Sequence, residues 1–161
     1  MLDGLTVRLA EPGDHRQIIE VMPAWWGGRD LRHAVPRLFL EHFTNTSFVM
    51  ERDGRMVGFI VGFLSQARPQ EGYAHFLGVD PAYHGQGIGR RLYERFFAVC
   101  RENGRSIVRA CASPVNKASV AFHQKMGFSL VAGDGEAQGI PYIQDYNRPG
   151  DHKVEFVKHL D

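Results

Sequence analysis

The sequence predicts an α/β (α+β) protein that folds as one domain over residues 1–161. Three observations predict this class. Short alternating apolar runs indicate strands, several longer segments carry apolar residues at helical spacing, and one glycine-rich stretch joins a strand directly to a helix. The length suits a single domain, and neither an internal repeat nor a linker divides the chain.

The composition argues against several classes of protein. A formal net charge of +1 argues against strong non-specific binding to nucleic acid. No apolar run reaches the roughly 18 residues that a membrane-spanning helix needs, and the N-terminus lacks a signal-peptide pattern. Cys100 and Cys111 make no disulfide framework, and no Cys/His cluster has zinc spacing. We therefore expect a reduced, cytoplasmic chain without a metal or a membrane partner.

Hydrophobic periodicity and turn residues place the elements in order. The expected strands span 5–9, 46–52, 56–64, 72–79, 105–111, 128–131 and 153–160. The expected helices span 14–22, 31–43, 90–100 and 113–125, with Asp14 as an N-cap, Pro23 as a stop, and Pro36 tolerated near a first turn or kinking its helix. Asp53-Gly54 indicates a hairpin, and residues 133–139 are flexible by composition. The strand over 56–64 is apolar almost throughout, so we expect it to be buried on both faces.

The glycine-rich stretch between the strand over 72–79 and the helix over 90–100 predicts a phosphate seat. Glycines at 85, 87 and 89 permit a close backbone approach and positive φ. The helix start behind them offers unpaired N–H groups and a partial positive charge. No Lys follows Gly89, as a Walker loop requires, and Arg90 occupies the last glycine position of the dinucleotide fingerprint. The sequence therefore fits neither fingerprint, which disfavours a nucleotide-binding βαβ protein.

Two motifs resemble those of the GNAT-family N-acetyltransferases. His84-x-x-Gly87-x-Gly89 is similar to the pyrophosphate loop of that family, Gln/Arg-x-x-Gly-x-Gly/Ala, with His84 as a departure. Asn116-x-x-Ser119-x-x-Phe122-His123-x-Lys125-x-Gly127-Phe128 resembles its second motif, where Tyr usually stands at position 123. The motifs lie in the family's order on the expected elements, and the resemblance covers nearly the whole chain.

The resemblance implies the GNAT fold, a mixed, mostly antiparallel sheet of about seven strands with a splayed parallel pair and about four helices. It implies acetyl-CoA as co-substrate and, by analogy, a homodimer. The strand over 77–79 would pair with the pantetheine arm, the glycine turn would bind the diphosphate, and the second motif would contact the coenzyme. The implied coenzyme-binding residues are Leu77, Gly78, Val79, His84, Gly85, Gln86, Gly87, Ile88, Gly89, Arg90, Asn116, Ser119, Phe122 and His123.

Two histidines are the candidate catalytic residues. Strict alternation places Tyr73, His75, Leu77 and Val79 on one face of their strand, and in the family a base often comes from this strand. We therefore expect His75 to accept the amine proton, directly or through water, or else to serve only as a hydrogen-bonded strand residue. His123 either assists departure of the thiolate or contacts the coenzyme or packs without proton transfer. Glu71, in the preceding loop, is a weaker candidate base.

The favoured function is transfer of an acetyl group from acetyl-CoA to a primary amine of a small molecule or peptide, by direct attack. A ping-pong route is disfavoured because Cys111 is expected to be buried. A domain that senses acyl-CoA without turnover stays open, because the family's Tyr at 123 and Glu at 73 are missing. Trp25, Trp26, Arg29, Tyr142 and Tyr146 lie in segments that line the acceptor side in relatives. The adjacent tryptophans either pack one ring and leave the other as a lid, or help to form the acceptor pocket.

Overall fold

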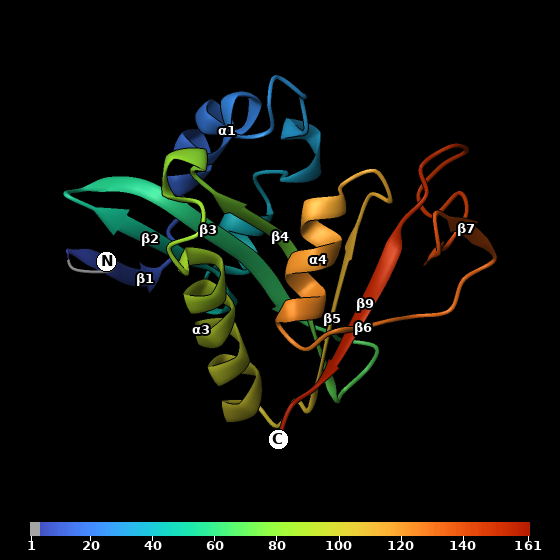
Figure 1. The fold of residues 1–161 in the computed structure, drawn as a ribbon. Helices are drawn as coiled ribbons and strands as arrows, with labels where there is room; N and C mark the ends of the chain where they lie inside the picture. The colour runs from blue at the N-terminus through green and yellow to red at the C-terminus, as the bar shows by residue number, and fades with distance from the viewer. Residues whose placement is uncertain (1–3) are drawn as a thin grey trace.

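A seven-stranded sheet organises residues 4–161, the part of the chain that the computed structural model describes (Figure 1). Its order is β1-β2-β3-β4-β5-β9-β6. The strands are β1 (Leu5–Leu9), β2 (Phe48–Arg52), β3 (Arg55–Leu64), β4 (Glu71–Val79), β5 (Ile107–Ala112), β6 (Ser129–Leu130) and β9 (Val154–His159). All neighbours in this sheet are antiparallel except β4 and β5, which are parallel. The predicted mixed sheet with one parallel pair is confirmed.

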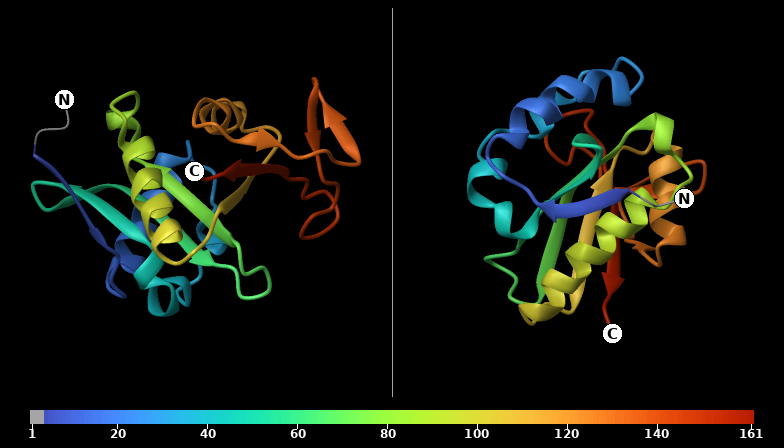
Figure 2. Two further views of the ribbon diagram at one scale, coloured as in Figure 1. Left: turned by 90° about the horizontal axis from the view of Figure 1, so that it is seen from below. Right: turned by 90° about the vertical axis from the view of Figure 1, so that its left-hand side faces the viewer.

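Helices cover both faces of the sheet. The α-helices are α1 (Asp14–Trp25), α2 (Phe39–His42), α3 (Ile88–Glu102) and α4 (Lys117–Lys125), and the 3₁₀ turns are η1 (Arg32–Ala34), η2 (Thr44–Thr46) and η3 (Pro81–Tyr83). Figures 1 and 2 show α3 and α4 over the same face, whereas the other face packs against α1 and α2. β3 contributes Val57 and Ile60 to the first core and Phe59 and Val61 to the second, so it is buried on both faces as predicted.

The predicted helix over residues 31–43 is wrong. The segment forms the three-residue turn η1 and the four-residue helix α2, separated by residues 35–38, which begin with Val35 and Pro36. Proline disfavours helical geometry in the residue before it and has no N–H for a helical hydrogen bond. Val35 accordingly has φ −122° and ψ 74°, outside the helical region, and its side chain is fully buried. The apolar residues of the segment therefore reach the core without a continuous helix.

Helix α1 passes through Pro23, at which the sequence predicted its end, and continues to Trp25. The aromatic residues beyond the proline stabilise this last turn. Trp25 stacks on Phe59 at a centroid distance of 6.1 Å, and Trp26 contacts Phe76 at 5.1 Å. Both tryptophans therefore pack on the same apolar cluster, and the expectation that one ring would serve as a lid is wrong.

Asp14 is the first residue of α1 and does not cap it. Its carboxylate accepts two 2.8 Å hydrogen bonds from the Arg8 guanidinium and a 2.7 Å bond from the Glu11 backbone N–H. Arg8 also bonds Glu51 on β2 at 2.9 Å. Asp14 therefore ties the helix start to strands β1 and β2.

The segment between β6 and β9 forms a hairpin where the sequence predicted only flexibility. Strands β7 (Gly135–Ala137) and β8 (Ile140–Tyr142) pair antiparallel around Gln138 and Gly139, which have φ values of 52° and 83°. Two successive positive φ angles are typical of a type I′ hairpin turn, for which Asn-Gly is the stronger sequence signal. The hairpin projects at the side of the molecule beyond β9 (Figures 1 and 2).

Candidate active site

The parallel pair is short, and its strands then separate. Residues 71–74 of β4 pair with 107–110 of β5, whereas β4 continues to Val79 and β5 to Ala112. Over residues 75–79, no strand within residues 4–161 pairs with β4 on the side of β5, whereas on the other side residues 76–79 stay paired with β3. Main-chain N–H and C=O groups therefore line an open edge, which can hydrogen-bond an extended ligand as an added strand would.

An unpaired residue in β4 changes which side chains face each helical layer. Opposite β3, Val61 pairs with Phe76 and Gly62 pairs with Ala74, so His75 has no partner and forms a bulge. Ala74 therefore shares the α3 side of the sheet with Leu77, although three positions separate them. Phe76 packs on the α1 side.

The expected common face of the β4 candidates is therefore wrong in part. His75 lies with Tyr73 on the side of α1 and α2, whereas Leu77 and Val79 pack against the α3 cluster. Gly78 faces the α1 side, where a methyl group at its Cα would come within 2.8 Å of the Trp26 ring. The strict period of two fails because the bulge adds one residue to the strand.

His75 is held by residues that precede β4 by more than thirty positions. Its Nε2 lies 2.6 Å from the Ala34 carbonyl oxygen, and its ring stacks on Phe39 at 4.3 Å with an interplanar angle of 7°. Because a carbonyl only accepts hydrogen bonds, Nε2 carries the proton and Nδ1 keeps a lone pair. Burial lowers the pKa of His75, the hydrogen bond to the Ala34 carbonyl opposes part of this effect, and the nearby Lys153 ammonium lowers that pKa further. The imidazole is therefore neutral near pH 7 and can accept a proton at Nδ1.

The glycine turn presents backbone groups at the start of α3. Gly85 and Gly87 have φ values of 78° and 81°, and Gly87 is the left-handed N-cap of the fifteen-residue helix. Any larger residue is strained at these angles. His84, Gly85, Gly87 and Arg90 are exposed, Gln86 is half-buried, and Ile88 is buried in the core. The turn thus offers main-chain N–H groups and the exposed Arg90 guanidinium to an anion.

Three elements approach one another at Gly89. A methyl group on its Cα would lie 3.0 Å from Phe122 Cζ of α4 and 3.6 Å from Leu77 Cδ2 of β4. Glycine therefore lets the helix start lie close to both elements. The glycine turn, the open edge of β4 and the second motif are in this way brought together, as the sequence predicted from segments far apart in the chain.

The beginning of α4 is capped by the second motif. Asn116 Oδ1 accepts a 3.1 Å hydrogen bond from the Ser119 backbone N–H, so the asparagine serves as the N-cap. Asn116, Ser119 and Phe122 are all half-buried. The Asn116 amide nitrogen has no hydrogen-bond acceptor among residues 4–161, so it is available to a ligand.

His123 is buried in an aromatic cluster, with 5% of its surface exposed. Its ring stacks on Phe156 at 4.3 Å with an interplanar angle of 2°. Nδ1 lies 2.8 Å from the Ser119 carbonyl, which only accepts, so Nδ1 donates and Nε2 accepts from the Tyr93 hydroxyl at 2.7 Å. Burial lowers the pKa of His123 and raises that of Tyr93. Both ring nitrogens are thus engaged within the protein.

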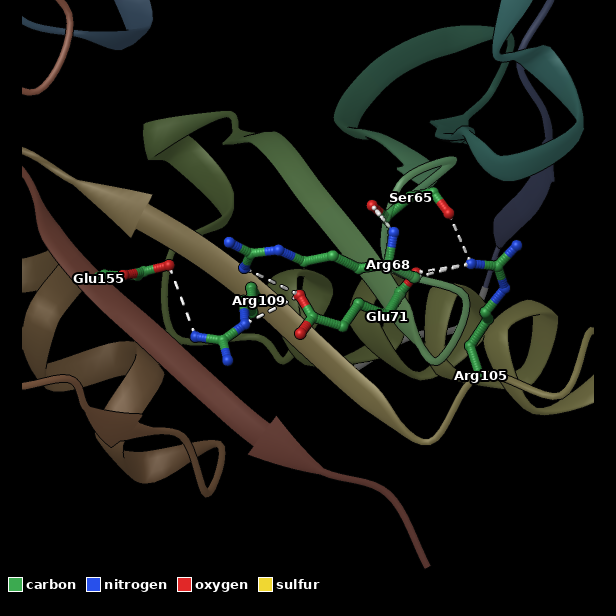
Figure 3. A network of polar contacts seen from close by, with 6 residues as sticks. All are labelled: Ser65, Arg68, Glu71, Arg105, Arg109 and Glu155. Atoms are coloured by element: carbon green, nitrogen blue, oxygen red, sulfur yellow. Dashed lines mark hydrogen bonds and ion pairs between the residues drawn. The ribbon is translucent and has the colours of Figure 1, made fainter.

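The side of β4, β5 and β9 away from α3 carries a ladder of charges (Figure 3). The Arg109 guanidinium of β5 bonds the Glu71 carboxylate of β4 at 2.9 Å and lies 3.5 Å from Glu155 of β9. These three side chains are 15–23% exposed. Arg68 adds an exposed contact to Glu71 at 3.4 Å. The ladder joins the three strands near the paired residues of β4 and β5, on the N-terminal side of the point where these two strands separate.

A second polar contact spans the parallel pair beside this ladder. The Tyr73 hydroxyl donates to Cys111 Sγ at 3.2 Å, and burial raises the pKa of both groups. Cys111 is half-buried, less enclosed than the sequence predicted. Of the residues expected on the acceptor side, Tyr146 is 43% exposed and lies near this pair. Tyr142 stacks on His152 at a centroid distance of 4.9 Å, and Arg29 is exposed. The tyrosine–cysteine contact joins residues 38 positions apart, and no motif of the sequence indicates it.

Comparison with known proteins gives this arrangement a family. A sequence model of the Acetyltransferase (GNAT) family matches residues 15–128, which include the open edge of β4, the glycine turn and α4. This chain belongs to the GNAT acetyltransferase family. Within residues 4–161 of this GNAT protein, no group of three or more His, Cys, Asp or Glu side chains could hold a metal ion, and no helix is long and apolar enough to cross a membrane.

Curated GNAT relatives match the chain in part. L-2,4-diaminobutyric acid acetyltransferase of Nocardia farcinica is 32% identical over 84 residues, 52% of this chain and 44% of that protein. N-alpha-acetyltransferase RimI of Mycobacterium tuberculosis is 35% identical over 79 residues, 48% of each chain. Mycothiol acetyltransferase of Thermomonospora curvata is 28% identical over 150 residues, 86% of this chain and 49% of that protein. The chain thus spans less than half the length of these relatives.

Solved structures share the fold over nearly the whole chain. Ard1 from Thermoplasma volcanium has a TM-score of 0.79 at 21% identity and covers 98% of this chain and 99% of its own. The yncA acetyltransferase of Salmonella typhimurium, solved with acetyl-CoA, has a TM-score of 0.72 at 19% identity and covers 99% and 95%. Because both identities lie below 25%, these similarities establish the fold alone. It is the GNAT fold that the resemblance of the motifs implied.

Proposed function

We propose that this chain is an acetyl-CoA-dependent N-acetyltransferase that acetylates a primary amine by direct attack. The observation that carries the proposal is the open edge of β4 over residues 75–79, which leads into the left-handed glycine turn before α3. The open edge suits an extended arm with amide groups, and the turn suits a diphosphate. Acetyl-CoA carries these two groups in this order, together with a reactive thioester.

The chemistry requires an acceptor for a proton and a polarised carbonyl. Acetyl-CoA supplies the thioester, whose carbonyl carbon the amine nitrogen attacks while the carbon–sulfur bond breaks. A backbone N–H on the open edge of β4 polarises the carbonyl oxygen. The amine must be neutral to attack, and His75 Nδ1 takes its proton, directly or through one water. The lowered pKa of His75 keeps this nitrogen unprotonated near pH 7.

The acceptor is a primary amine of a small molecule or peptide. The half-buried Trp26, beside β4, and the exposed Tyr146 give the acceptor side aromatic walls that suit an amine with apolar or cationic parts. Relatives named for diaminobutyric acid, for mycothiol and for N-alpha-acetylation indicate how widely acceptors vary on this scaffold. A homodimer and a cytoplasmic location stay predictions, of which light scattering tests the first.

A second function, sensing of acyl-CoA without turnover, is favoured by one observation. Both nitrogens of His123 are engaged by Ser119 and Tyr93, so His123 has no free nitrogen with which to protonate a departing thiolate. A free thiol has a pKa of about 8.5, so a thiolate can also depart unprotonated. We therefore rank turnover first and sensing second.

A matched pair of glycine variants tests coenzyme binding at the turn. Gly87 and Gly104 have φ values of 81° and 71° at opposite ends of α3, and a Cβ at either would meet no atom within 4 Å. Both alanine variants should therefore lose similar stability, about 1 kcal/mol. Only Gly87→Ala should weaken acetyl-CoA binding in calorimetry, by about 10-fold or more. Equal affinities in the two variants would contradict a diphosphate site at this turn.

A panel of amines scored by thiol release from acetyl-CoA then separates transfer from sensing. Turnover with any amine supports the enzyme, whereas tight binding with no turnover supports the sensor. His75→Ala should lower kcat by about 10²–10⁴-fold and remove the acidic limb of the pH–rate profile. An unchanged acidic limb in that variant would exclude His75 as the base.

A further inference from the structure

The broken segment over residues 31–43 exposes a carbonyl that a helix would have used. In a continuous helix, the Ala34 carbonyl would accept the Leu38 N–H, four residues on. Pro36 prevents this, because Val35 leaves the helical region at φ −122° and ψ 74°. The Ala34 carbonyl accepts instead from His75 Nε2 at 2.6 Å, across 41 residues of sequence.

The same segment also fixes the plane of the imidazole. Phe39, the first residue of α2, lies parallel to His75 at 4.3 Å and 7°. Phe39 is held in turn by Phe43 at 5.3 Å and Phe63 at 6.4 Å. The bulge removes His75 from the regular pairing with β3, so β3 does not set its orientation. The orientation of the ring is therefore set mainly by the 31–43 segment.

We propose that the proline-broken segment is a positioning device for His75. Pro36 leaves the Ala34 carbonyl free to hold the proton on Nε2, Phe39 clamps the ring, and Nδ1 is thereby kept as the basic nitrogen. Pro36 and Phe39 are positioning residues, since they act through His75. The inference rests on the proposed function only for the use of that nitrogen, because the tautomer itself exists in the enzyme without substrate.

Nitrogen NMR of histidine-labelled protein reads the tautomer directly, with His75→Gln to assign the signal. Wild type should show a protonated Nε2 and an unprotonated Nδ1 for His75 near pH 7.5. In Pro36→Ala the Ala34 carbonyl can return to a helical partner, and His75 should become a mixture of tautomers. A wild-type His75 protonated on Nδ1, or an unaltered tautomer in Pro36→Ala, would overturn the proposal.

Kinetics test whether the clamp matters to turnover. Phe39→Leu removes the stacked ring, and the matched control Phe43→Leu removes a ring of the same cluster that does not stack on His75. Phe39→Leu should lower kcat by about 10- to 100-fold with little change in KM for acetyl-CoA, and Phe39→Tyr should restore it. Equal losses in Phe39→Leu and Phe43→Leu would reduce the ring to packing and refute the clamp.

The proposed transfer and the proposed positioning of His75 can be refuted independently of each other. An enzyme inactive with every amine would defeat the proposed transfer, yet the NMR signal of His75 would still confirm or refute the role of Pro36. Activity that depends on His75, together with an Nδ1–H tautomer, would keep the transferase and remove the positioning device.

Discussion

The buried bond between Tyr93 and His123 allows a decisive double-mutant cycle. Tyr93→Phe deletes the hydroxyl that Nε2 accepts from at 2.7 Å, and leaves that nitrogen unpartnered in a residue that is 5% exposed. An unsatisfied buried group costs about 1–3 kcal/mol. His123→Phe should cost a similar amount, because it strands the Tyr93 hydroxyl in the same way. The double variant replaces both partners by apolar rings and should lie within about 1 kcal/mol of wild type.

Urea unfolding followed by circular dichroism near pH 7.5 measures the four free energies of the cycle. For a chain of this size each kcal/mol also lowers the melting temperature by roughly 2–4 °C. The same His123→Phe protein, assayed at saturating acetyl-CoA, should keep wild-type turnover if the ring only packs. Additive losses across the cycle would refute the bond as a coupled pair. A folded His123→Phe protein without turnover would restore His123 as a proton donor.

Three further predictions concern stability. Burial lowers the pKa of His123, so below about pH 6.5 the unfolded chain binds more protons than the folded one, and stability falls as the pH drops. The Tyr93→Phe/His123→Phe protein should lose less stability than wild type between about pH 7 and pH 5 in urea unfolding, and equal losses would contradict this. Arg109→Met should cost about 1–3 kcal/mol, less in high salt, because it leaves the half-buried carboxylates on β4 and β9 unpaired; a salt-independent cost in urea unfolding would point to lost packing alone. Gly62→Ala should cost about 1–3 kcal/mol, because its methyl group would collide with the fully buried Phe96 ring, and an unchanged urea midpoint would show that the ring yields freely.

Most of the sheet and the glycine turn could be predicted from local patterns. The strands around residues 48–79 and the helix α3 carry their apolar period in the sequence, and the glycines before α3 have the positive φ that such a turn needs. The helix over 31–43 failed because its apolar residues have helical spacing, yet Pro36 outweighs that spacing by removing a donor and restricting Val35.

The sequence predicted which elements carry the site residues, but it did not predict which atoms those residues contact. The motifs located His75 and His123 on their elements, but the atoms that bond them belong to Ala34 and Tyr93, 41 and 30 residues away in sequence. A bulge leaves no local signal either, because an extra residue in a strand resembles ordinary alternation until the partner strand is known. This is why the orientation of Leu77 was predicted wrongly.

The unpaired residue in β4 also limits how this strand can be engineered or aligned. Deleting His75 would give β4 an uninterrupted ladder with β3, because Ala74 and Phe76 already pair with the neighbouring residues of β3, and positions 76–79 would keep their layers. Substitutions copied without a gap from a relative whose strand is straight would be shifted by one position on one side of the bulge and would land on the opposite surface. Any graft at these positions therefore has to allow for the extra residue.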